Sequence, residues 1–470
     1  MFNRDRFVFV SNLKDVSCDP VRPLTHLRDA YLLSERYTSA KALQLAKFAK
    51  GRKNTLFSDN GNFSRMRRIA RRFEQEGEAL LAMVSEEGLT TELRQKRTSL
   101  WEGVVRACED EMASLDHGRI VARQLKMQPH AMIGLEDFAI PVLQMTGLLR
   151  PELAPRTRDV ARFQRKTKVL FLKEVRGGLP QVALPDGVVP YLVLHAYHYS
   201  SAAQAGRALR GRDEVQAIAI SYGATMRSNR WISKVRMGRT VVNFTEKLPE
   251  KYVVSQVLTR GALDGVRRKV RLHLLGVWSP IMVVLSALFL PRTLGVSLDS
   301  TAPLMDAGDG VIYGSRHAYL KMKRYKLAAA VLVEGTSYDS RQPFWLDFDR
   351  KYPSDWHALR RTLGVVSTSE PRSIEAALES DQVLVRRYIP YFSRMKGGRD
   401  PFFKDLRIAR SGSNYWVLKE VVDAVRRRME RPAALRRWIR TECERYERVA
   451  HPKWALAVNE AAKVANINPA

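Results

Sequence analysis

Two aspartates, Asp299 and Asp59, each follow directly after a short apolar segment that is typical of a β-strand. Residues 294–298 precede Asp299, and residues 54–58 precede Asp59. Carboxylates at the carboxyl ends of parallel strands, as in α/β barrels, are in the position of catalytic side chains. A pair of carboxylates can displace a group from a sugar carbon, one as the nucleophile and the other as the acid/base. Asp299 and Asp59 are therefore the candidate catalytic residues.

Each aspartate also has a structural alternative. Asp299 is followed by a serine and a threonine, a combination that is suited to capping a helix or a turn. Asp59 begins an Asp-Asn-Gly sequence, which is common in turns. Taken singly, neither motif decides between catalysis and a structural role.

Polar and aromatic residues follow three more predicted strands, which cover residues 131–135, 188–194 and 215–220. The candidate ligand-binding residues, with Asn60 beside Asp59, are Glu136, Asp137, His195, Tyr197, Ser221, Tyr222 and Gly223. His195 and His198 are three residues apart, but no acidic or thiolate third ligand is near them in the sequence. Contact with a base or sugar, or packing, is therefore favoured over a metal pair.

A strand, a buried helix and a second strand follow one another in the segment that ends at Asp299. Residues 270–277 are β-rich, Pro280 suits a first helical position, and residues 281–290 form an apolar helical run. The second strand is the one that ends at Asp299, so this βαβ unit implies parallel strands. The uninterrupted apolar run of ten residues, 281–290, is too short to cross a bilayer.

Seven candidate strands, most of them followed by a helix, predict an α/β fold of the TIM type, a (β/α)8 barrel. The first strand covers residues 7–10, and residues 328–333 are the expected eighth strand. Residues 19–50 are expected to be helical. We place the barrel, with helical insertions, in residues 1–335 and a basic, mostly helical extension in residues 336–470.

The chain is strongly basic, because 79 Lys and Arg stand against 49 Asp and Glu, which gives a net charge of +30. Such an excess indicates a polyanionic partner, and nucleic acid is favoured over an anionic membrane surface. The candidate phosphate contacts lie on a predicted helix and in a basic, aromatic-rich segment, and they are Arg65, Arg68, Arg72, Arg386 and Arg387. Solvated helix faces are the alternative. The C-terminal region is equally suited to binding nucleic acid and to capping the barrel.

The three cysteines, Cys18, Cys108 and Cys443, are too few and too scattered for a disulfide framework or a zinc site. This usage fits a reducing cytoplasm. We expect neither a secretion signal nor a cofactor or bound metal.

Four motifs at predicted strand ends occur in one order along the chain. They are Asp-Asn-Gly-Asn-Phe at 59–63, Leu-Glu-Asp at 135–137, Leu-Gly-Val-Trp-Ser-Pro at 275–280 and Gly-Val-Ser-Leu-Asp-Ser-Thr-Ala-Pro at 295–303. In this order they resemble the Asp-Ser-Gly-Gly-Phe, Phe-Asp-Glu, Leu-Gly-Val-Gly-x-Pro and Gly-x-Asp-x-Phe-Asp-Cys-x-x-Pro motifs of the tRNA-guanine transglycosylase superfamily. The last motif is one residue shorter here, and the resemblance covers roughly residues 7–335.

The resemblance implies a (β/α)8 barrel that exchanges guanine for a 7-deazaguanine, such as 7-cyano-7-deazaguanine, through a covalent aspartyl-sugar intermediate. Asp299 would be the nucleophile. Asp59 would protonate the leaving guanine and deprotonate the incoming base. Glu136, with Asp137, would bind the amino and ring N–H groups of the purine, because an ionised carboxylate accepts two such bonds.

The segment over residues 221–223 is similar in position to a Gly-Gly-Leu segment that contacts the base in this family. Its backbone is expected to make the same contact here. Tyr197 or Tyr222 would stack on the heterocycle.

Members of the superfamily that act on tRNA carry a zinc site of three cysteines and a histidine after the nucleophile strand, but no cysteine lies between Cys108 and Cys443 here. The glycine-rich motifs are altered as well. A divergent branch, found in bacterial genomic islands and phages, inserts 7-deazaguanines into DNA, and the altered motifs and basic charge resemble that branch more closely. We therefore expect DNA, with tRNA as the alternative, a 7-deazapurine base and a DNA-remodelling protein as partners. Duplex DNA would require the target nucleotide to be flipped out.

Two other functions use the same residues or the same charge. The first is a noncatalytic nucleic-acid-binding protein on a degenerate barrel. The second is hydrolytic removal of the base, in which water resolves the sugar-enzyme ester, and it needs the same two carboxylates.

Overall fold

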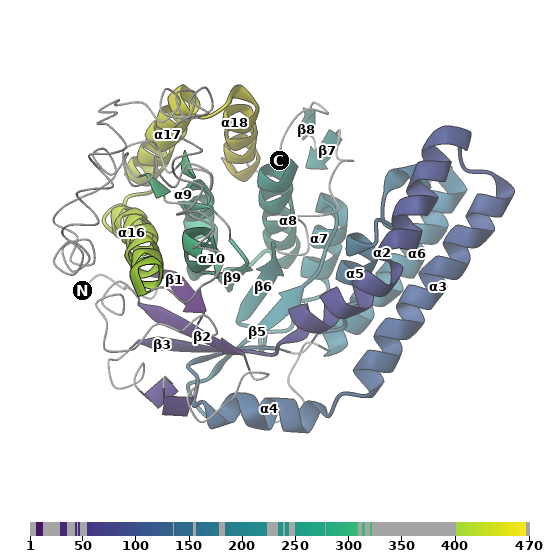
Figure 1. Ribbon diagram of the computed structural model, residues 1–470, viewed down its shortest axis with the longest axis horizontal. Coiled ribbons are helices and arrows are strands. Elements are labelled where there is room, and N and C mark those ends of the chain that lie inside the picture. The colour runs from purple at the N-terminus through teal and green to yellow at the C-terminus, as the bar shows by residue number, and fades with distance from the viewer. Residues whose placement is uncertain are drawn as a thin grey trace.

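Eight parallel strands form a closed barrel (Figure 1). This is the computed structural model of the chain, and it describes residues 6–12, 29–34, 43–44, 46–47, 54–134, 136–153, 157–177, 184–222, 234–237, 240–243, 250–277, 279–308, 313–314, 320–321 and 401–466. In order around the barrel the strands are β1 (Phe7–Asn12), β10 (Gly295–Ser300), β9 (Arg271–Leu275), β6 (Ala217–Ser221), β5 (Val189–Leu194), β4 (Ala131–Ile133), β3 (Thr55–Asp59) and β2 (Ala30–Ser34). The predicted (β/α)8 fold class is confirmed.

Helices lie outside the barrel, and three long ones, α2, α3 and α6, stand together on one side of it (Figure 1). The helices that follow β3 are α2 (Asn62–Glu87), α3 (Thr91–Ala113) and α4 (His117–Lys126). Those that follow β4 and β5 are α5 (Ala139–Met145), α6 (Thr157–Gly177) and α7 (Tyr199–Arg207), with a short 3-10 turn over Pro151–Leu153.

The second half of the barrel has shorter connections. A hairpin of β7 (Lys234–Met237) and β8 (Thr240–Asn243) precedes α8 (Glu250–Val266). Between β9 and β10 lie α9 (Pro280–Ser286) and a 3-10 segment over Ala287–Arg292. After β10 come α10 (Ala302–Gly308) and the short pair β11 (Tyr313–Gly314) and β12 (Leu320–Lys321).

Alternate residues of each strand point to the inside and the outside of the barrel, because strand side chains have a period of two. Val10, Leu32 and Phe57 belong to the cluster that fills the interior. Their outward-facing counterparts, such as Phe9 and Leu298, belong to the larger cluster shared with the surrounding helices. This burial on both faces is why the strands appear in the sequence as nearly continuous apolar runs.

The strand β2 corrects the prediction that residues 19–50 are helical. Its five residues, Ala30–Ser34, are all buried and pair in parallel with β1 on one side and β3 on the other. A short apolar run of this length is compatible with either a helix or a strand, and here the tertiary pairing decides. Because β2 completes the barrel, the expected eighth strand at 328–333 is not needed for closure, and those residues lie outside the described part of the chain.

Three C-terminal helices pack against the barrel: α16 (Pro401–Arg426), α17 (Pro432–Val449) and α18 (Pro452–Asn466). Helix α16 contacts β1, α9 and α10, so it lies over the seam between the first and last strands (Figure 1). Helix α18 packs mainly on α8. The predicted boundary at residue 335 falls outside the described residues.

Arg426, at the end of α16, ties this helix to the barrel. Its Nε donates to the carbonyl oxygen of Phe7 at 2.9 Å, and its Nη1 lies 3.0 Å from Asp29 Oδ2. The side chain is almost fully buried. One residue therefore joins the C-terminal helix to β1 and to the start of β2. None of the helices described here is both long and apolar enough to cross a membrane.

Replacing Arg426 with methionine is expected to lower the free energy of unfolding by about 2 kcal/mol, because a buried carbonyl and an aspartate lose their partner. Urea denaturation of Arg426→Met and of Arg440→Met, an exposed arginine of α17, measures the difference. Equal stability of the two variants would contradict the role of Arg426.

Candidate functional site

Four of the predicted site residues lie together at the carboxyl ends of the barrel strands. The charge of Asp59 raises the pKa of Asp299, and the charge of Glu136 raises the pKa of Asp59, so the three carboxyl groups lie near one another. His195 Nε2 lies 3.8 Å from Glu136 Oε1. The structure thus brings residues from β10, β3, and the loops after β4 and β5 to one mouth of the barrel.

Asp299 lies within β10 and its carboxylate is held by the loop after β9. Its Oδ1 accepts a hydrogen bond from the Gly276 N–H at 2.9 Å, and its carbonyl accepts one from Val277 at 2.9 Å. Gly276 has a φ of 78°, which a residue with a side chain rarely adopts. The N–H of Ala302 is capped by Ser300 Oγ, so this turn does not use Asp299 as its cap.

Burial, together with the smaller effect of the nearby Asp59 charge, raises the pKa of Asp299 from its ordinary value of 3.8 to about 7. The hydrogen bond from Gly276 acts in the opposite direction. Asp299 is only 8% exposed, so desolvation of its charged form dominates. A carboxyl group of this kind holds a proton near neutral pH and can lose it when a positive charge develops nearby.

Asp59 ends β3 and begins the turn into α2. Its Oδ2 accepts the Gly61 N–H at 3.1 Å, and Gly61 has a φ of 70°. Burial, followed by the charge of Glu136, raises the pKa of Asp59 to about 6. The hydrogen bond from Gly61 partly offsets this. The Asp-Asn-Gly sequence therefore forms a turn and also places a perturbed carboxyl group in the barrel mouth.

Asn60 connects this turn to Glu136. Its Nδ2 donates to Glu136 Oε2 at 2.6 Å and to the carbonyl of Gly134 at 2.5 Å. Glu136 and His195 are each 3% exposed. His195 Nε2 has no hydrogen-bond partner among the described residues, so this buried nitrogen and Glu136 Oε1 are available to a ligand.

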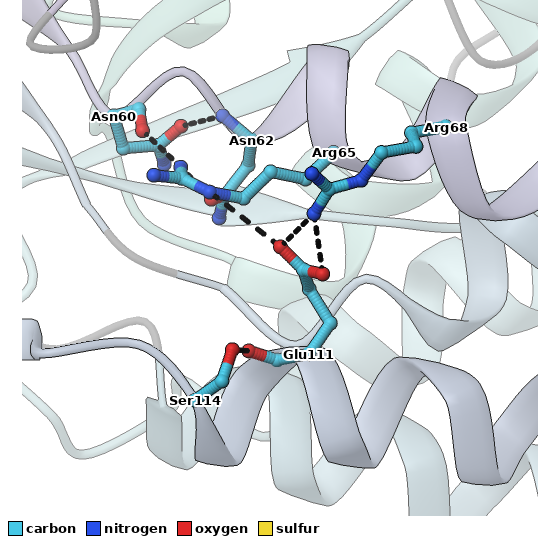
Figure 2. Close-up of polar contacts among 6 residues, drawn as sticks. All are labelled: Asn60, Asn62, Arg65, Arg68, Glu111 and Ser114. Atoms are coloured by element: carbon cyan, nitrogen blue, oxygen red, sulfur yellow. Dashed lines mark hydrogen bonds and ion pairs between the residues drawn. The ribbon is translucent and has the colours of Figure 1, made fainter.

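Two of the predicted phosphate-binding arginines bind Glu111 of α3 instead of facing solvent alone (Figure 2). Arg65 Nη1 donates to the carbonyl of Asn60 at 2.8 Å and to Asn62 Oδ1 at 2.9 Å. Arg68 Nη2 binds both oxygens of Glu111 at 2.5 and 2.6 Å. Arg65 therefore braces the turn that carries Asp59, with Glu111 balancing its charge.

Arg72 is exposed, with its guanidinium 5.6 Å from the centre of the Phe73 ring. It is one turn farther along α2 than Arg68. Arg386 and Arg387 lie outside the described residues.

Other predicted residues point into the protein. Asp137 Oδ1 accepts the Ala139 N–H at 3.1 Å and so caps α5. The hydroxyl of Tyr222 hydrogen-bonds Thr259 of α8 at 2.7 Å, and Tyr222 is fully buried.

The remaining predicted residues are Tyr197, Ser221 and Gly223. Tyr197 is buried, and its ring packs 4.2 Å from that of His198. Ser221 ends β6 at the barrel mouth. Gly223 lies outside the described residues.

His198 caps a helix and does not form a pair with His195. Its Nδ1 accepts the Ser201 N–H at 2.9 Å at the start of α7, and burial lowers its pKa to about 4. Within the described part of the chain, no group of three His, Cys, Asp or Glu residues could hold a metal ion. The Ser201 hydroxyl in turn accepts the backbone N–H of His198 at 3.1 Å, which completes a capping box at the start of α7.

Two polar residues inside the barrel were not among the predicted site residues. His273 is fully buried in β9, 3.6 Å from Asp299 through its Nε2, and Ser297 lies beside it on β10. Their signal is a histidine and a serine inside otherwise apolar strands.

A cavity lies at the opposite mouth of the barrel. It has a volume of about 200 Å³ and lies at the amino ends of the strands, where its polar lining includes Thr55, His130, Tyr191, Arg271 and Ser297. Asp299, Asp59 and Glu136 do not line this cavity.

Replacing Asp299 with asparagine is expected to stabilise the protein at pH 8 by about 2–4 kcal/mol and to have little effect near pH 4. The folded-state pKa, about 7, is above the unfolded value, so the folded protein binds the proton more tightly. The stability that the protonated Asp299 contributes is therefore fully present below about pH 4 and is lost as the pH rises through 7. Asparagine never ionises, and its oxygen can still accept from Gly276.

Urea denaturation at both pH values tests this expectation. Asp116→Asn, at the exposed cap of α4, is the matched control because asparagine also caps helices. If Asp299→Asn raised the free energy of unfolding equally at pH 4 and pH 8, the pKa of Asp299 would not be perturbed.

No protein-family model matches this chain, and no curated protein sequence is significantly similar to it. The candidate site is therefore defined by its residues and their geometry.

Proposed function

We propose that this protein exchanges guanine in DNA for a 7-deazaguanine through a covalent aspartyl-sugar intermediate. The observation that carries the proposal is the pair of buried carboxyl groups, Asp299 and Asp59, whose pKa values are raised to about 7 and about 6 at one mouth of the barrel. Two coupled carboxyl groups are what retention of configuration at a sugar carbon requires. The four strand-end motifs that resemble the transglycosylases contain both of them.

The proposed reaction has two displacements. The Asp299 carboxylate attacks C1′, the bond from C1′ to N9 of guanine breaks, and Asp59 gives its proton to the leaving base. The incoming 7-deazaguanine then loses a proton to Asp59 and attacks C1′, which breaks the ester and frees Asp299. The ring nitrogen of each base passes through the same position, so one acid/base group serves both steps.

Glu136 is the proposed base-recognition residue. It is buried, and a hydrogen bond from Asn60 fixes one of its oxygens, so the rest of its lone pairs can accept purine N–H groups. His195 lies on the other side of the same carboxylate. Buried polar groups of this kind discriminate strongly, because a base that lacks the matching donors leaves them unpaired.

The net charge of +30 supports a polyanionic substrate, and the absence of a cysteine between Cys108 and Cys443 favours DNA over tRNA. Arg72 on α2 and exposed arginines on α17, such as Arg436 and Arg440, are available for phosphate contacts. Arg65 and Arg68 form ion pairs with Glu111, and Arg65 also supports the turn that carries Asp59.

Purified protein is expected to release labelled guanine from DNA in the presence of 7-cyano-7-deazaguanine. Asp299→Asn and Asp59→Asn should each reduce the rate by at least about a thousandfold, because each removes an obligatory group. Asp116→Asn, the exposed control, should retain the wild-type rate. Release from tRNA alone would replace DNA as the substrate, release without the deazapurine would indicate hydrolysis, and DNA binding without any release would indicate a noncatalytic protein.

The pH dependence of kcat/KM is expected to be bell-shaped, with apparent pKa values of about 6 and about 7 that belong to the pair of carboxyl groups. The rate rises with pH as Asp299 ionises and falls as Asp59 loses the proton that the leaving base needs. A steady-state assay from pH 5 to pH 9 measures both limbs. A rate that is still rising at pH 9 would contradict these assignments.

A further inference from the structure

His273 is a polar ring in the centre of an apolar barrel. It is fully buried, its ring stacks on Phe57 with centroids 5.0 Å apart, and Tyr191 meets it edge-on at 5.7 Å. Burying an imidazole in this way is costly unless its nitrogens have partners. The partners of its two nitrogens therefore indicate what the ring does.

The shortest hydrogen bond of Ser297 indicates which nitrogen of His273 carries the proton. Ser297 Oγ lies 2.8 Å from His273 Nδ1 and 3.4 Å from the carbonyl of Leu272, so its proton goes to Nδ1.

This direction leaves Nε2 of His273 as the nitrogen with the hydrogen. Burial lowers the pKa of His273 to about 3, so the ring is neutral and has one N–H. Nε2 lies 3.6 Å from Asp299 Oδ1 and has no hydrogen-bond partner among the described residues. Catalytic hydrogen bonds are often long before the substrate binds and shorten in the complex.

We propose that His273 is a positioning residue for the nucleophile: its Nε2–H is directed at Asp299 Oδ1 and stabilises the ionised carboxylate, while Ser297 holds the ring in the required tautomer. The other groups that face Asp299 are Asp59, which disfavours the charge, and the Gly276 N–H, which favours it. The catalytic part of this inference rests on the proposed function, whereas the interaction itself does not.

Two substitutions separate this role from simple packing. His273→Gln retains an N–H close to the place of Nε2, whereas His273→Leu fills a similar volume without a donor. If the ring only packs, both variants change stability without changing the ionisation of Asp299. If it donates, only the leucine variant raises the pKa of Asp299.

The first test needs no enzymatic activity. Unfolding is measured against pH for the wild-type protein and both His273 variants, each with and without Asp299→Asn. The midpoint that belongs to Asp299 is expected to rise by about one pH unit in His273→Leu and by less than half as much in His273→Gln. Asp299→Asn should abolish the difference. Equal midpoints in all three proteins would overturn the proposal.

Ser297→Ala provides a second variant if His273→Leu does not fold. This substitution removes the hydroxyl that keeps the proton of His273 on Nε2. The midpoint that belongs to Asp299 is therefore expected to rise, but by less than in His273→Leu. A midpoint in Ser297→Ala that equals the wild-type midpoint would again overturn the proposal.

The second test is kinetic. His273→Leu should move the rising limb of the kcat/KM profile to higher pH and lower the rate at pH 6 by about tenfold, with KM for DNA unchanged and with recovery in His273→Gln. Exchange activity without a shifted midpoint would reject the role of His273 and leave the proposed function standing. A shifted midpoint in a protein with no exchange activity would reject the proposed function and leave the interaction between His273 and Asp299 standing.

Discussion

The burial of two carboxyl groups in the mouth of a barrel is the constraint on which this structure depends. Desolvation raises the pKa of both Asp299 and Asp59, and each is compensated by an N–H from a glycine, Gly276 or Gly61. Both glycines have φ values between 70° and 78°, where a side chain would be strained. The backbone therefore limits the cost of two buried acids without neutralising them, which leaves them reactive near neutral pH.

The rest of the fold keeps these groups in place. Glu111 on α3 holds Arg65, and Arg65 holds the turn that contains Asp59, so the long helices beside the barrel act as a brace for the site. Arg426 of α16 bonds to β1, which is the neighbour of the strand that carries Asp299. Segments distant in sequence thus converge on one pair of carboxyl groups, and a rigid scaffold of this kind is what precise positioning requires.

Much of the architecture could be predicted from the sequence, because buried parallel strands leave long apolar runs that end in polar residues. Seven of the eight strands were predicted in this way, but β2 was not, since its short, mostly apolar run of five residues is equally compatible with a helix and only pairing with β1 and β3 decides. Arg65 could not be distinguished from a phosphate contact, because its partner Glu111 is distant in sequence. His273 could not be identified as a site residue, because its relation to Asp299 exists only in the closed barrel.

The most direct test of the account is to trap the covalent intermediate. The protein is mixed with a guanine-containing DNA oligonucleotide in the absence of any acceptor base, denatured rapidly, digested and analysed by mass spectrometry. We expect a sugar-linked adduct on the peptide that contains Asp299, and none in Asp299→Asn. Release of guanine with no adduct, or with an adduct on another residue, would contradict the assignment of Asp299 as the nucleophile.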